Sequence, residues 1–410
     1  MSKTRRDPKG RALKKGETYS AGKKSYCFTF TDPIGQRRFI YSKDLIKLRE
    51  REMDLQRDSL DGLETYAHGN SNLNFLFERY MKTKHALRSS TRTNYIGTYN
   101  RYVKNSIGKK KISDIRYSDM LYFYQTFIDR GYKVATVDNI QTILGPAFQM
   151  AVRDNILRIN PTTGVVGEIK RNLAGRPEPR HALTPEEEKA FLSFLDRPEY
   201  YRCRALFIFM FGTGCRVGEA IGIRWDDIKL DEGVIDINHD LTYYPREQHS
   251  FKCEYEIGDP KTVAGFRTIP LLTSVKETLL EEKENQRKYG YRNLMELDGY
   301  KNFVFCNRFG SFMNAGSIND QIGRIVDRYN AGEEVKAAKE HREPLVIPKF
   351  SCHITRHTFC SRLCENGTNI KLIQQIMGHS DIRTTMNIYA EVSKQTANAV
   401  FQDLNEENIL

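Results

Sequence analysis

The chain has 410 residues, 39% of them hydrophobic, and a formal net charge of +12 at neutral pH. This length is enough for two or three domains with separate cores. No apolar run approaches the ~18 residues of a membrane span, and the basic N-terminus lacks the apolar core of a signal peptide. The eight cysteines follow no disulfide framework, which favours a reducing cytoplasm. Cys360 and Cys364, with His357 one turn earlier, match no recognised zinc site, so we interpret them as small buried residues.

The positive charge is concentrated in the first part of the chain. Residues 1–49 hold 14 Lys and Arg against 4 Asp and Glu, and residues 71–166 hold 15 against 6, whereas the rest is slightly acidic. Basic segments of this kind are typical of proteins that bind nucleic acid. The sequence therefore predicts two basic DNA-binding modules ahead of a nearly neutral body.

The first module, residues 1–66, is expected to be a small α+β domain. Its first 20 residues are basic and turn-rich, so we expect them to remain flexible until DNA binds. Residues 24–42 alternate as two strands around a turn at 32–35. A helix over residues 43–60 follows, and its predicted apolar side consists of Leu45, Leu48 and either Met53 or Leu55.

Cations on this hairpin are expected to be exposed, and a small sheet with such a face can lie in a major groove. They are Lys23, Lys24, Arg37 and Arg38. A solvated surface hairpin is the alternative interpretation. We favour DNA binding because the basic excess is concentrated in this module.

The second module, residues 72–165, is predicted to be an all-α domain. Its helices are expected over residues 75–81, 91–103, 118–130 and 136–153, the third of them capped by Gly131. Three tyrosines at helical spacing indicate core packing rather than base stacking, namely Tyr95, Tyr99 and Tyr102. The cations that would face DNA are Lys84, Arg88, Arg92, Lys109, Lys110 and Lys111. For the run of three lysines, a solvated loop is an equal alternative.

A linker rich in glycine and proline is predicted for residues 166–181, and a third domain for residues 182–390. This domain is expected to be mainly helical with a small antiparallel β-sheet. It begins at the N-cap Thr184, with proline at the first helical position. The tail, residues 391–410, reads as a short amphipathic helix that packs either on its own domain or on a neighbouring copy.

Within the third domain, helices over residues 201–212 and 216–225 are expected to flank Arg216, and strand signals fill residues 233–271. Residues 243–259 are longer than a minimal hairpin requires. We interpret them as an insertion that touches or shapes DNA. A further helix is predicted for residues 353–364.

Six residues of this domain stand in an order that suits attack on a phosphodiester. They are Arg216, Lys261, His353, Arg356, His379 and Tyr389. Taken singly, each is an ordinary surface or core residue, whereas the joint order indicates one shared site. Two arginines would hold both non-bridging phosphate oxygens, because the guanidinium donates two hydrogen bonds and stays charged at every working pH.

Tyrosine suits a reaction in which the bond must be remade, because a phosphotyrosine ester conserves the energy of the broken link. A phenol has an ordinary pKa of about 10, so it needs a base or a positive field, which His353 can supply. Lys261 would protonate the departing 5′ oxygen, and Lys252 in the same presumed β region is the alternative. Since neither a phosphate-binding loop nor a carboxylate cluster is present, we expect neither ATP nor a metal or other cofactor.

These residues resemble the tyrosine recombinase, or phage integrase, family. The family order of Arg, hairpin Lys, His-x-x-Arg, a second His and a terminal Tyr falls on the six residues above. Glu219 matches the acid that the family keeps three residues after its first arginine, where it helps to orient the site. The signature Gly-His-Ser followed by Thr-Thr-x-x-x-Tyr stands at residues 378–380 and 384–389. The first module resembles the arm-binding module of integrases from conjugative transposons.

The resemblance implies arm-binding, core-binding and catalytic domains that act on double-stranded DNA at arm and core attachment sites. It implies a 3′-phosphotyrosyl intermediate formed by Tyr389 and strand exchange through a Holliday junction. A homotetramer in the bacterial cytoplasm would integrate and excise a mobile element, helped by an excisionase and a host DNA-bending protein. The tail of each protomer would dock on its neighbour. A type IB topoisomerase and a non-catalytic DNA-binding regulator are the alternative functions.

Overall fold

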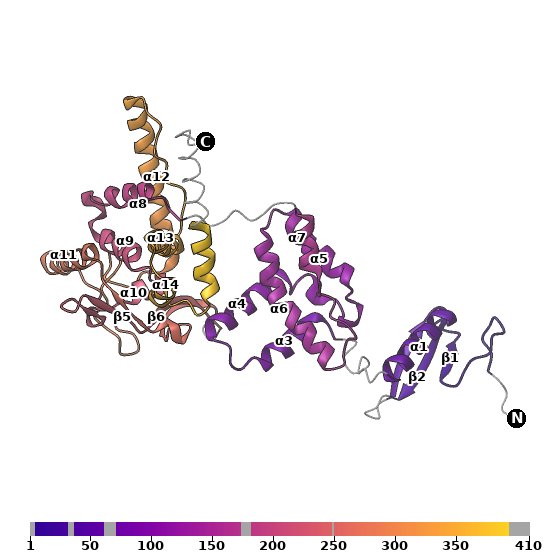
Figure 1. Ribbon diagram of the computed structural model, residues 1–410. Coiled ribbons are helices and arrows are strands. Elements are labelled where there is room, and N and C mark those ends of the chain that lie inside the picture. Colours follow the sequence, from indigo (N-terminus) through magenta and orange to yellow (C-terminus); the bar gives the residue numbers. More distant parts are fainter. Residues whose placement is uncertain (1–4, 32–36, 61–70, 174–181, 248–249, 393–410) are drawn as a thin grey trace. The chain divides into compact units, whose positions relative to one another are not determined.

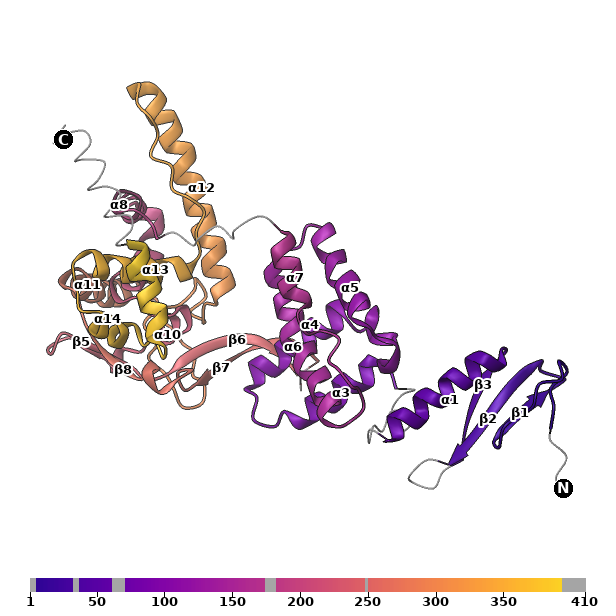
Figure 2. The same ribbon diagram turned by 45° about the vertical axis from the view of Figure 1, so that its right-hand side comes forward.

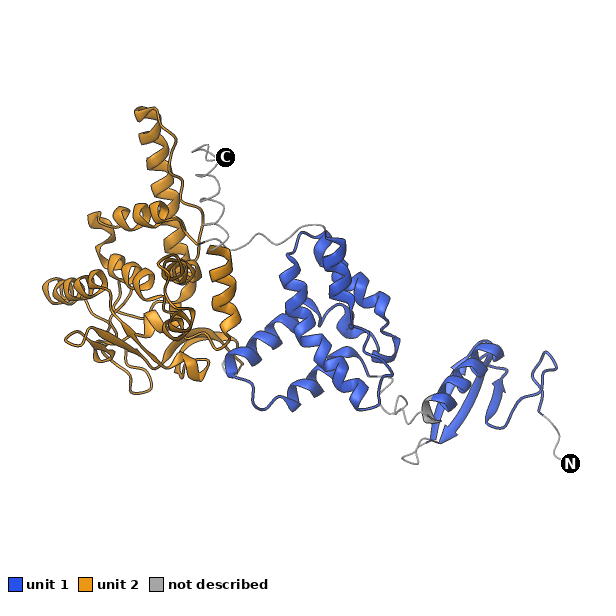
Figure 3. Cartoon of the chain, in the orientation of Figure 1, with its two compact units in different colours: residues 1–176 blue, residues 177–410 orange. Residues whose placement is uncertain are grey.

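The computed structural model describes residues 5–31, 37–60, 71–173, 182–247 and 250–392 (Figure 1). The chain divides into two compact units, residues 1–176 and 177–410 (Figure 3). The first unit holds a small α+β domain and a helical domain, and the second is mainly helical with two small antiparallel sheets. This confirms the predicted fold class. Within the described stretches, no helix is long and apolar enough to cross a membrane.

The α+β domain contains β1 (Glu17–Ser20), β2 (Ser25–Thr31) and β3 (Arg37–Ser42), which pair antiparallel in that order. Helix α1 (Leu45–Leu60) packs on one face through Leu45 and Leu48. Because side chains alternate along a strand, Phe39 and Tyr41 stand on the other face of β3, 53% and 57% exposed. The predicted strands and helix are confirmed, and the predicted turn at 32–35 lies outside the described residues.

One expectation for this domain was wrong. Residues 5–20, expected to be flexible, include β1 and a turn in which the buried carboxylate of Asp7 accepts hydrogen bonds from Arg11 and from the hydroxyl of Tyr26. These long-range polar contacts fix the segment to β2, and no local sequence pattern signals them. Of the two residues predicted as alternatives on α1, Leu55 belongs to the apolar side, because it is half-buried whereas Met53 is 57% exposed.

The helical domain consists of α3 (Leu73–Thr83), α4 (Ser89–Tyr102), α5 (Tyr117–Asp129), α6 (Val134–Arg153) and α7 (Val165–Asn172), with short 3₁₀ turns at Ile107–Lys109 and Ile112–Asp114. Tyr99 is fully buried and stacks on Phe77 with ring centroids 3.7 Å apart. Tyr95 and Tyr102 pack against the same core, which confirms the prediction for the three tyrosines. Gly131 follows the end of α5 with φ +80°, as expected for a cap.

The predicted linker at 166–181 begins too early. Residues 165–172 form α7, and its Val165 and Ile169, one helical turn apart, are buried in the core of the helical domain. Because this stretch is rich in glycine and basic residues and places only two apolar residues in the core, its sequence did not indicate a helix. Residues 174–181, the rest of the predicted linker, lie outside the described residues.

The helices of the second unit are α8 (Pro185–Phe194), α9 (Tyr201–Thr213), α10 (Val217–Gly222), α11 (Thr273–Tyr289), α12 (Ala315–Glu340), α13 (Cys352–Glu365), α14 (Ile370–Met377) and a last helix whose described part covers residues 382–392. α9 lies in the core, with Leu206, Phe207, Phe209 and Met210 fully buried. Thr184 caps α8 as predicted, accepting a hydrogen bond from the amide of Glu187. α10 is shorter than the predicted 216–225, and a 3₁₀ turn at Trp225–Asp227 follows it.

Two sheets complete this unit. β4 (Ile228–Lys229), β5 (Val234–Ile237) and β8 (Arg267–Pro270) form one, and β6 (Asp240–Arg246) pairs with β7 (Lys252–Gly258) in the other. Figure 2 shows β6 and β7 as a long curved hairpin. Its register runs from the Asp240–Gly258 pair at the base to the Arg246–Lys252 pair near the tip. At about 3.3 Å per residue, the strands span roughly 20 Å.

Candidate functional site

Arg216 is placed by a sharp turn between two helices. α9 is capped at its C-terminal end by Gly214, whose φ of +61° suits glycine, and a Cβ there would lie 2.5 Å from the ring of Phe359. The chain then enters α10, with Arg216 at its N-cap. The carboxylate of Glu219, one turn into this helix, accepts hydrogen bonds from the amide and from Nη1 of Arg216, at 2.8 and 2.7 Å.

Three arginines from different parts of the fold bind three consecutive carbonyls at the end of α14. Arg267 Nε donates to Ile376 at 2.7 Å, Arg356 Nη2 donates to Met377, and Arg216 Nη2 donates to Gly378 at 3.1 Å. The last carbonyls of a helix lack partners within it and carry partial negative charge, so cations bind them well. His379 follows directly, and the cluster therefore surrounds it.

Glu219 lies between two of these arginines and is only 2% exposed. Arg267 meets it with both Nη atoms, at 3.1 and 2.8 Å, and is itself 5% exposed. Burial alone would raise the pKa of Glu219, but the hydrogen bonds and charge of Arg267, together with Arg216, outweigh it and hold the pKa below its ordinary value. The carboxylate is therefore ionised at neutral pH.

Arg356 is the most deeply placed of the predicted cations. It stands on α13 with Nη1 donating to the carbonyl of Gly214 at 2.7 Å. Burial, reinforced by the nearby charge of Arg216, lowers its pKa to about 10, so it remains protonated at neutral pH. Arg216 and Arg356 are therefore held by the same two turns, the one at Gly214 and the one at Gly378.

His379 is held in its neutral form. Its Nδ1 lies 2.9 Å from the hydroxyl of Thr385, which is fully buried. Burial and the positive charges of Arg356 and Arg216 lower its pKa to about 4. Thr385 was noticed in the sequence only as part of a signature, and its contact with His379 was not predicted.

Lys261, His353 and Tyr389 lie at the surface of the same unit. His353 stands on α13 three residues before Arg356, and when it is protonated its charge adds to the effects that lower the pKa of His379. Tyr389 is 38% exposed on the helix of residues 382–392. The neighbouring Ile388 anchors this helix in a small apolar cluster with α13 and α14.

The loop that carries Lys261 runs past the arginine cluster. A Cβ on Gly378 would lie 2.7 Å from the carbonyl oxygen of Ala264, and Arg267 Nη1 donates to the carbonyl of Gly265 at 3.0 Å. Lys252 instead lies at the far end of β7, near the tip of the hairpin. The two lysines, indistinguishable by sequence, are therefore separated by the length of a strand.

Arg267 was missed as a site residue. Its partner Glu219 is 48 residues away, so no local spacing pairs them, and the sequence reads simply as the start of a strand. His357, Cys360 and Cys364 lie on α13. Among the residues that the structure describes, no group of three or more potential ligands gathers as a metal site would require.

The predicted DNA-facing cations of the first module differ in exposure. Lys23 and Lys24 lie in the exposed turn between β1 and β2. Arg37 shares the outer face with Phe39 and Tyr41, whereas Arg38 is half-buried on the α1 side. Only the first three of the four cations are therefore as exposed as predicted.

In the helical domain, Lys84 and Arg88 flank the connection between α3 and α4, and Arg92 donates to the carbonyl of Met81 at 3.1 Å. The lysine run at 109–111 is not a loose loop, because the amide of Leu73 bonds the carbonyl of Lys110 at 3.1 Å. This fixes the backbone of the run while leaving Lys109 and Lys111 exposed.

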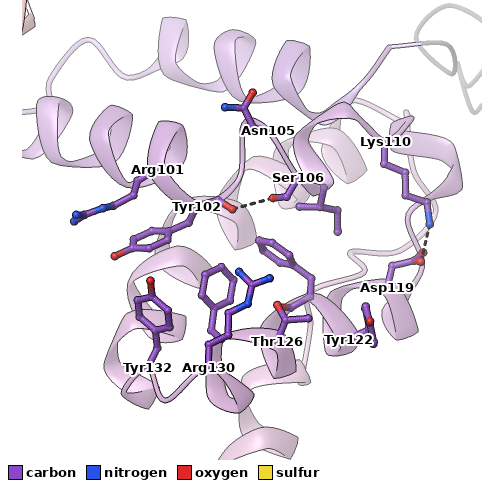
Figure 4. Close-up of a pocket in the computed structure, with 13 residues that line it drawn as sticks. Arg101, Tyr102, Asn105, Ser106, Lys110, Asp119, Tyr122, Thr126, Arg130 and Tyr132 are labelled. Carbon is purple, nitrogen blue, oxygen red and sulfur yellow. Dashed lines mark hydrogen bonds and ion pairs between the residues drawn. The ribbon is translucent and has the colours of Figure 1, made fainter.

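The helical domain also holds a pocket of about 650 Å³ (Figure 4). Lys110 pairs with Asp119 at its edge, at 2.6 Å. Tyr102 and Tyr132 line another side, with their rings edge to face, 6.0 Å between centroids. None of the six predicted catalytic residues lines this pocket, so it is distinct from the arginine cluster.

Comparison with known proteins gives consistent matches. The profile of the phage integrase family matches residues 181–396, and that of the DNA-binding domain of Tn916 integrase matches residues 1–59. The transposase from transposon Tn916 of Enterococcus faecalis is 28% identical over 425 residues, covering 99% of this chain and 98% of that protein. The transposase from transposon Tn1545 of Streptococcus pneumoniae gives the same identity and coverage.

Solved structures of integrases also match this chain. The Tn1549 transposon integrase in complex with transposon right end DNA is 28% identical and matches with a TM-score of 0.67, over 82% of this chain and 99% of that chain. A lambda integrase dimer bound to a core site is 17% identical and matches with a TM-score of 0.51, over 92% of this chain and 95% of that chain. The latter likeness concerns the fold alone.

Proposed function

The chain belongs to the phage integrase family of tyrosine recombinases, and from this premise we propose that it integrates and excises a conjugative transposon. It is an enzyme that acts on DNA. Its relatives of similar length are transposases of Tn916 and Tn1545, and the matched Tn1549 integrase structures contain transposon end DNA and circular intermediate DNA. Both kinds of DNA are what integration and excision require.

In the proposed reaction, the Tyr389 oxygen attacks the phosphorus and the bond to the 5′ oxygen breaks. The products are a 3′-phosphotyrosyl link and a 5′-hydroxyl, and His353 takes the phenol proton while Lys261 protonates the leaving oxygen. The 5′-hydroxyl then attacks the partner strand's phosphotyrosine, and two such exchanges make and resolve a Holliday junction. Because the bond energy is kept in the ester, the cycle needs no ATP, and the cations supply the charge that a metal otherwise would.

The convergence of arginines on the end of α14 carries this proposal. Arg216 and Arg356 each use two of their five N–H groups on the hydrogen bonds described above, which leaves donors for two phosphate oxygens. His379, neutral at pH 7, has Nδ1 on the Thr385 hydroxyl. With Thr385 donating, the ring proton sits on Nε2 and is available to a phosphate oxygen.

The position of Lys261 supports it over Lys252 as the general acid. Its loop packs on Gly378, beside the residues that would hold the phosphate. Lys252 lies at the other end of β7, roughly 20 Å along the strand from Gly258 at the base of the hairpin. The loop that carries Lys261 and the arginine cluster therefore lie against each other.

We assign DNA contacts to the two basic domains. The outer face of the first sheet, with Arg37, Phe39 and Tyr41, suits a major groove at arm sites, and its match to an integrase DNA-binding domain supports this. In the helical domain, the cations between α3 and α4 and the lysine run suit core sites. The proposed boundaries are 1–66 for the arm domain, 72–173 for the core domain and 182–390 for the catalytic domain.

We further propose a homotetramer on DNA, assisted by an excisionase and a DNA-bending protein. Tetrameric assembly on a Holliday junction is reported for lambda integrase, which shares the fold. The tail of residues 391–410, most of which lies outside the described residues, would dock on a neighbouring protomer. Truncation after Glu391 tests this, since unaltered assembly on DNA and normal control of cleavage would refute it.

The test of the chemistry is covalent trapping on a nicked attachment-site duplex, resolved on a denaturing gel. We expect a protein–DNA adduct with the intact chain, none with Tyr389→Phe, and a normal adduct with Tyr289→Phe, an exposed tyrosine in the same unit. An adduct that survives Tyr389→Phe would show that another residue is the nucleophile.

The same assay separates the alternative functions. If DNA binds but the intact chain forms no adduct, the chain is a regulator that has kept the fold. If an adduct forms and supercoiled plasmids lacking paired sites are simply relaxed, the protein acts as a topoisomerase. Recombination that requires two attachment sites supports the integrase.

A further inference from the structure

Arg267, the first residue of β8, has almost no exposed surface and directs its guanidinium wholly into the protein. Nε donates to Ile376, Nη1 to Gly265 and Glu219, and Nη2 to Glu219, at distances of 2.7 to 3.1 Å. Four of its five N–H groups are thereby bound to protein acceptors, against two in the equally buried Arg356, so this guanidinium is committed to the protein rather than to a phosphate. Its influence on the reaction must pass through its partners.

Two of those partners, Glu219 and Ile376, belong to the segments that position the phosphate-binding side chains. Glu219 holds Arg216 by both its main chain and its side chain. Ile376 carries the first of the three carbonyls to which the arginines donate, one each. The turn that follows it leads to His379. Arg267 is therefore the brace between the carboxylate that orients Arg216 and the turn that presents His379.

The charge of the cluster depends on the same residue. Arg216, Arg267 and Arg356 carry three positive charges against the one negative charge of Glu219. Without Arg267, Glu219 would be balanced by Arg216 alone, and the arginine facing the phosphate would act as half of a neutral pair. Charge interactions are strong at buried sites, so this difference reaches the phosphate.

We propose that Arg267 is a positioning residue for strand cleavage, which neutralises Glu219 and braces the end of α14 so that Arg216 keeps its charge and direction for the phosphate. The role rests on the proposed function, because the reaction it supports is the attack by Tyr389. The two-point bond requires the planar fork of arginine, which lysine does not reproduce.

The test compares full-length Arg267→Met, Arg267→Lys, Glu219→Gln and the double variant Glu219→Gln/Arg267→Met. Single-turnover cleavage of a nicked attachment-site duplex is measured at saturating protein, and DNA affinity is measured separately. We expect Arg267→Met to slow cleavage about 100-fold, because a small misplacement of positioning groups has an effect of this size, with unchanged affinity. Arg267→Lys should fall between it and the intact chain.

The double variant supplies the decisive comparison. Removing both the carboxylate and its brace returns the cluster to a net charge of two, so the double variant should cleave faster than Arg267→Met alone. A double variant that loses the product of the two single losses would show independent effects and overturn the proposal. Wild-type cleavage by Arg267→Met would overturn it as well.

A pH profile distinguishes this role from a merely structural one. The charge of Arg267 contributes to the low pKa of His379, so Arg267→Met should move the acid limb of the cleavage profile to higher pH, while Arg267→Lys should leave it in place. An unmoved limb in Arg267→Met counts against the proposal.

Arg224→Met is the matched control. Arg224 also makes a two-point bond to a buried carboxylate, that of Asp227 at 2.9 and 2.7 Å, but outside the arginine cluster. We expect it to lower the unfolding temperature without slowing cleavage, and an equal slowing would attribute the Arg267 effect to destabilisation. If the intact chain forms no covalent complex, the proposed function fails; if intact chain and Arg267→Met cleave alike, only this inference fails.

Discussion

The buried hydroxyl of Thr385 lies 2.9 Å from Nδ1 of His379, and this contact joins the turn after α14 to the helix that carries Tyr389. His379 belongs to the arginine cluster through the carbonyls that precede it, and Thr385 lies one turn from Tyr389 on the helix of residues 382–392. The hydrogen bond therefore couples the orientation of a phosphate-binding imidazole to the position of the nucleophile.

Replacement of Thr385 by valine should uncouple the two. Valine keeps the shape but leaves Nδ1 of His379 without its partner, so the ring can adopt the tautomer that does not donate from Nε2. We expect cleavage to slow by about 10- to 100-fold, in the range seen when a hydrogen bond that orients a reactive group is lost, with unchanged DNA affinity. Single-turnover cleavage and a binding titration measure the two effects.

Thr358→Val is the control for this variant. Thr358 is another fully buried threonine of the same unit, and its hydroxyl accepts one hydrogen bond, from the amide of Leu183 at 3.1 Å. Its loss should lower the free energy of unfolding by about 1–2 kcal/mol, as for other buried hydrogen bonds, and leave cleavage unchanged. Equal cleavage by Thr385→Val and the intact chain would refute the coupling.

Gly378→Ala should damage the site through the backbone. Gly378 has φ +62°, and an added Cβ would lie 2.7 Å from the carbonyl oxygen of Ala264 and 3.1 Å from Arg267. The left-handed conformation costs alanine about 1–2 kcal/mol, and the close contact pushes the Lys261 loop away from the cluster. We expect lower stability by urea unfolding and a large loss of cleavage.

Gly290→Ala separates these two effects. Gly290 has φ +67° at the end of α11, and a Cβ there would meet nothing within 4 Å. It should show the same backbone cost without any loss of cleavage. If both variants cleave alike after correction for the unfolded fraction, the packing of the loop on Gly378 has no part in the reaction.

The sequence and the structure agree where the signal is local. The amphipathic helices, the Thr184 cap and the order of the predicted catalytic residues could all be read along the chain, because each depends on neighbours a few positions apart. The brace formed by Arg267 and the contact of Thr385 with His379 depend on how the chain folds back on itself. For the same reason β1 was missed, since the contacts of Asp7 that hold its segment are with Tyr26 and other residues outside any periodic pattern.

The stability of the second unit should depend on pH through His379. In the unfolded chain an ordinary histidine takes up a proton below about pH 6.5, whereas in the folded chain its pKa is about 4. Between these values the unfolded state binds the proton and is favoured. The free energy of unfolding should therefore fall as pH drops from 6.5 to 4, by at most about 3 kcal/mol.

The measurement is urea unfolding at several pH values for the intact chain and His379→Gln, and the difference between the two curves isolates the histidine. This subtraction is needed because Glu282 acts in the opposite direction. Burial raises the pKa of Glu282 to about 7, so its folded form takes up a proton first and gains stability as pH falls from 7 to its ordinary pKa. A difference curve that stays flat between pH 6.5 and 4 would contradict the placement of His379.

Shortening the β6–β7 hairpin should weaken DNA binding or bending without abolishing the chemistry. The outer end of the hairpin carries the pair Arg246 and Lys252. Its base lies beside α10, where Asp240 packs on Gly218. Replacing residues 244–254 by a tight two-residue turn removes the outer part and keeps the base pairs that hold α10 and the Arg216 turn.

We expect the shortened chain to bind attachment-site duplex more weakly, or to bend it less, and to cleave it at the normal rate once bound at saturation. Fluorescence anisotropy gives the affinity, end-to-end energy transfer gives the bend, and the nicked substrate gives the rate. A Lys252→Ala variant of the full hairpin serves as the control for a single lost cation, and it should keep full cleavage because Lys261 is the proposed acid. Affinity and bend that both equal those of the intact chain would refute a DNA contact by the hairpin, and a cleavage defect in Lys252→Ala would reassign the acid.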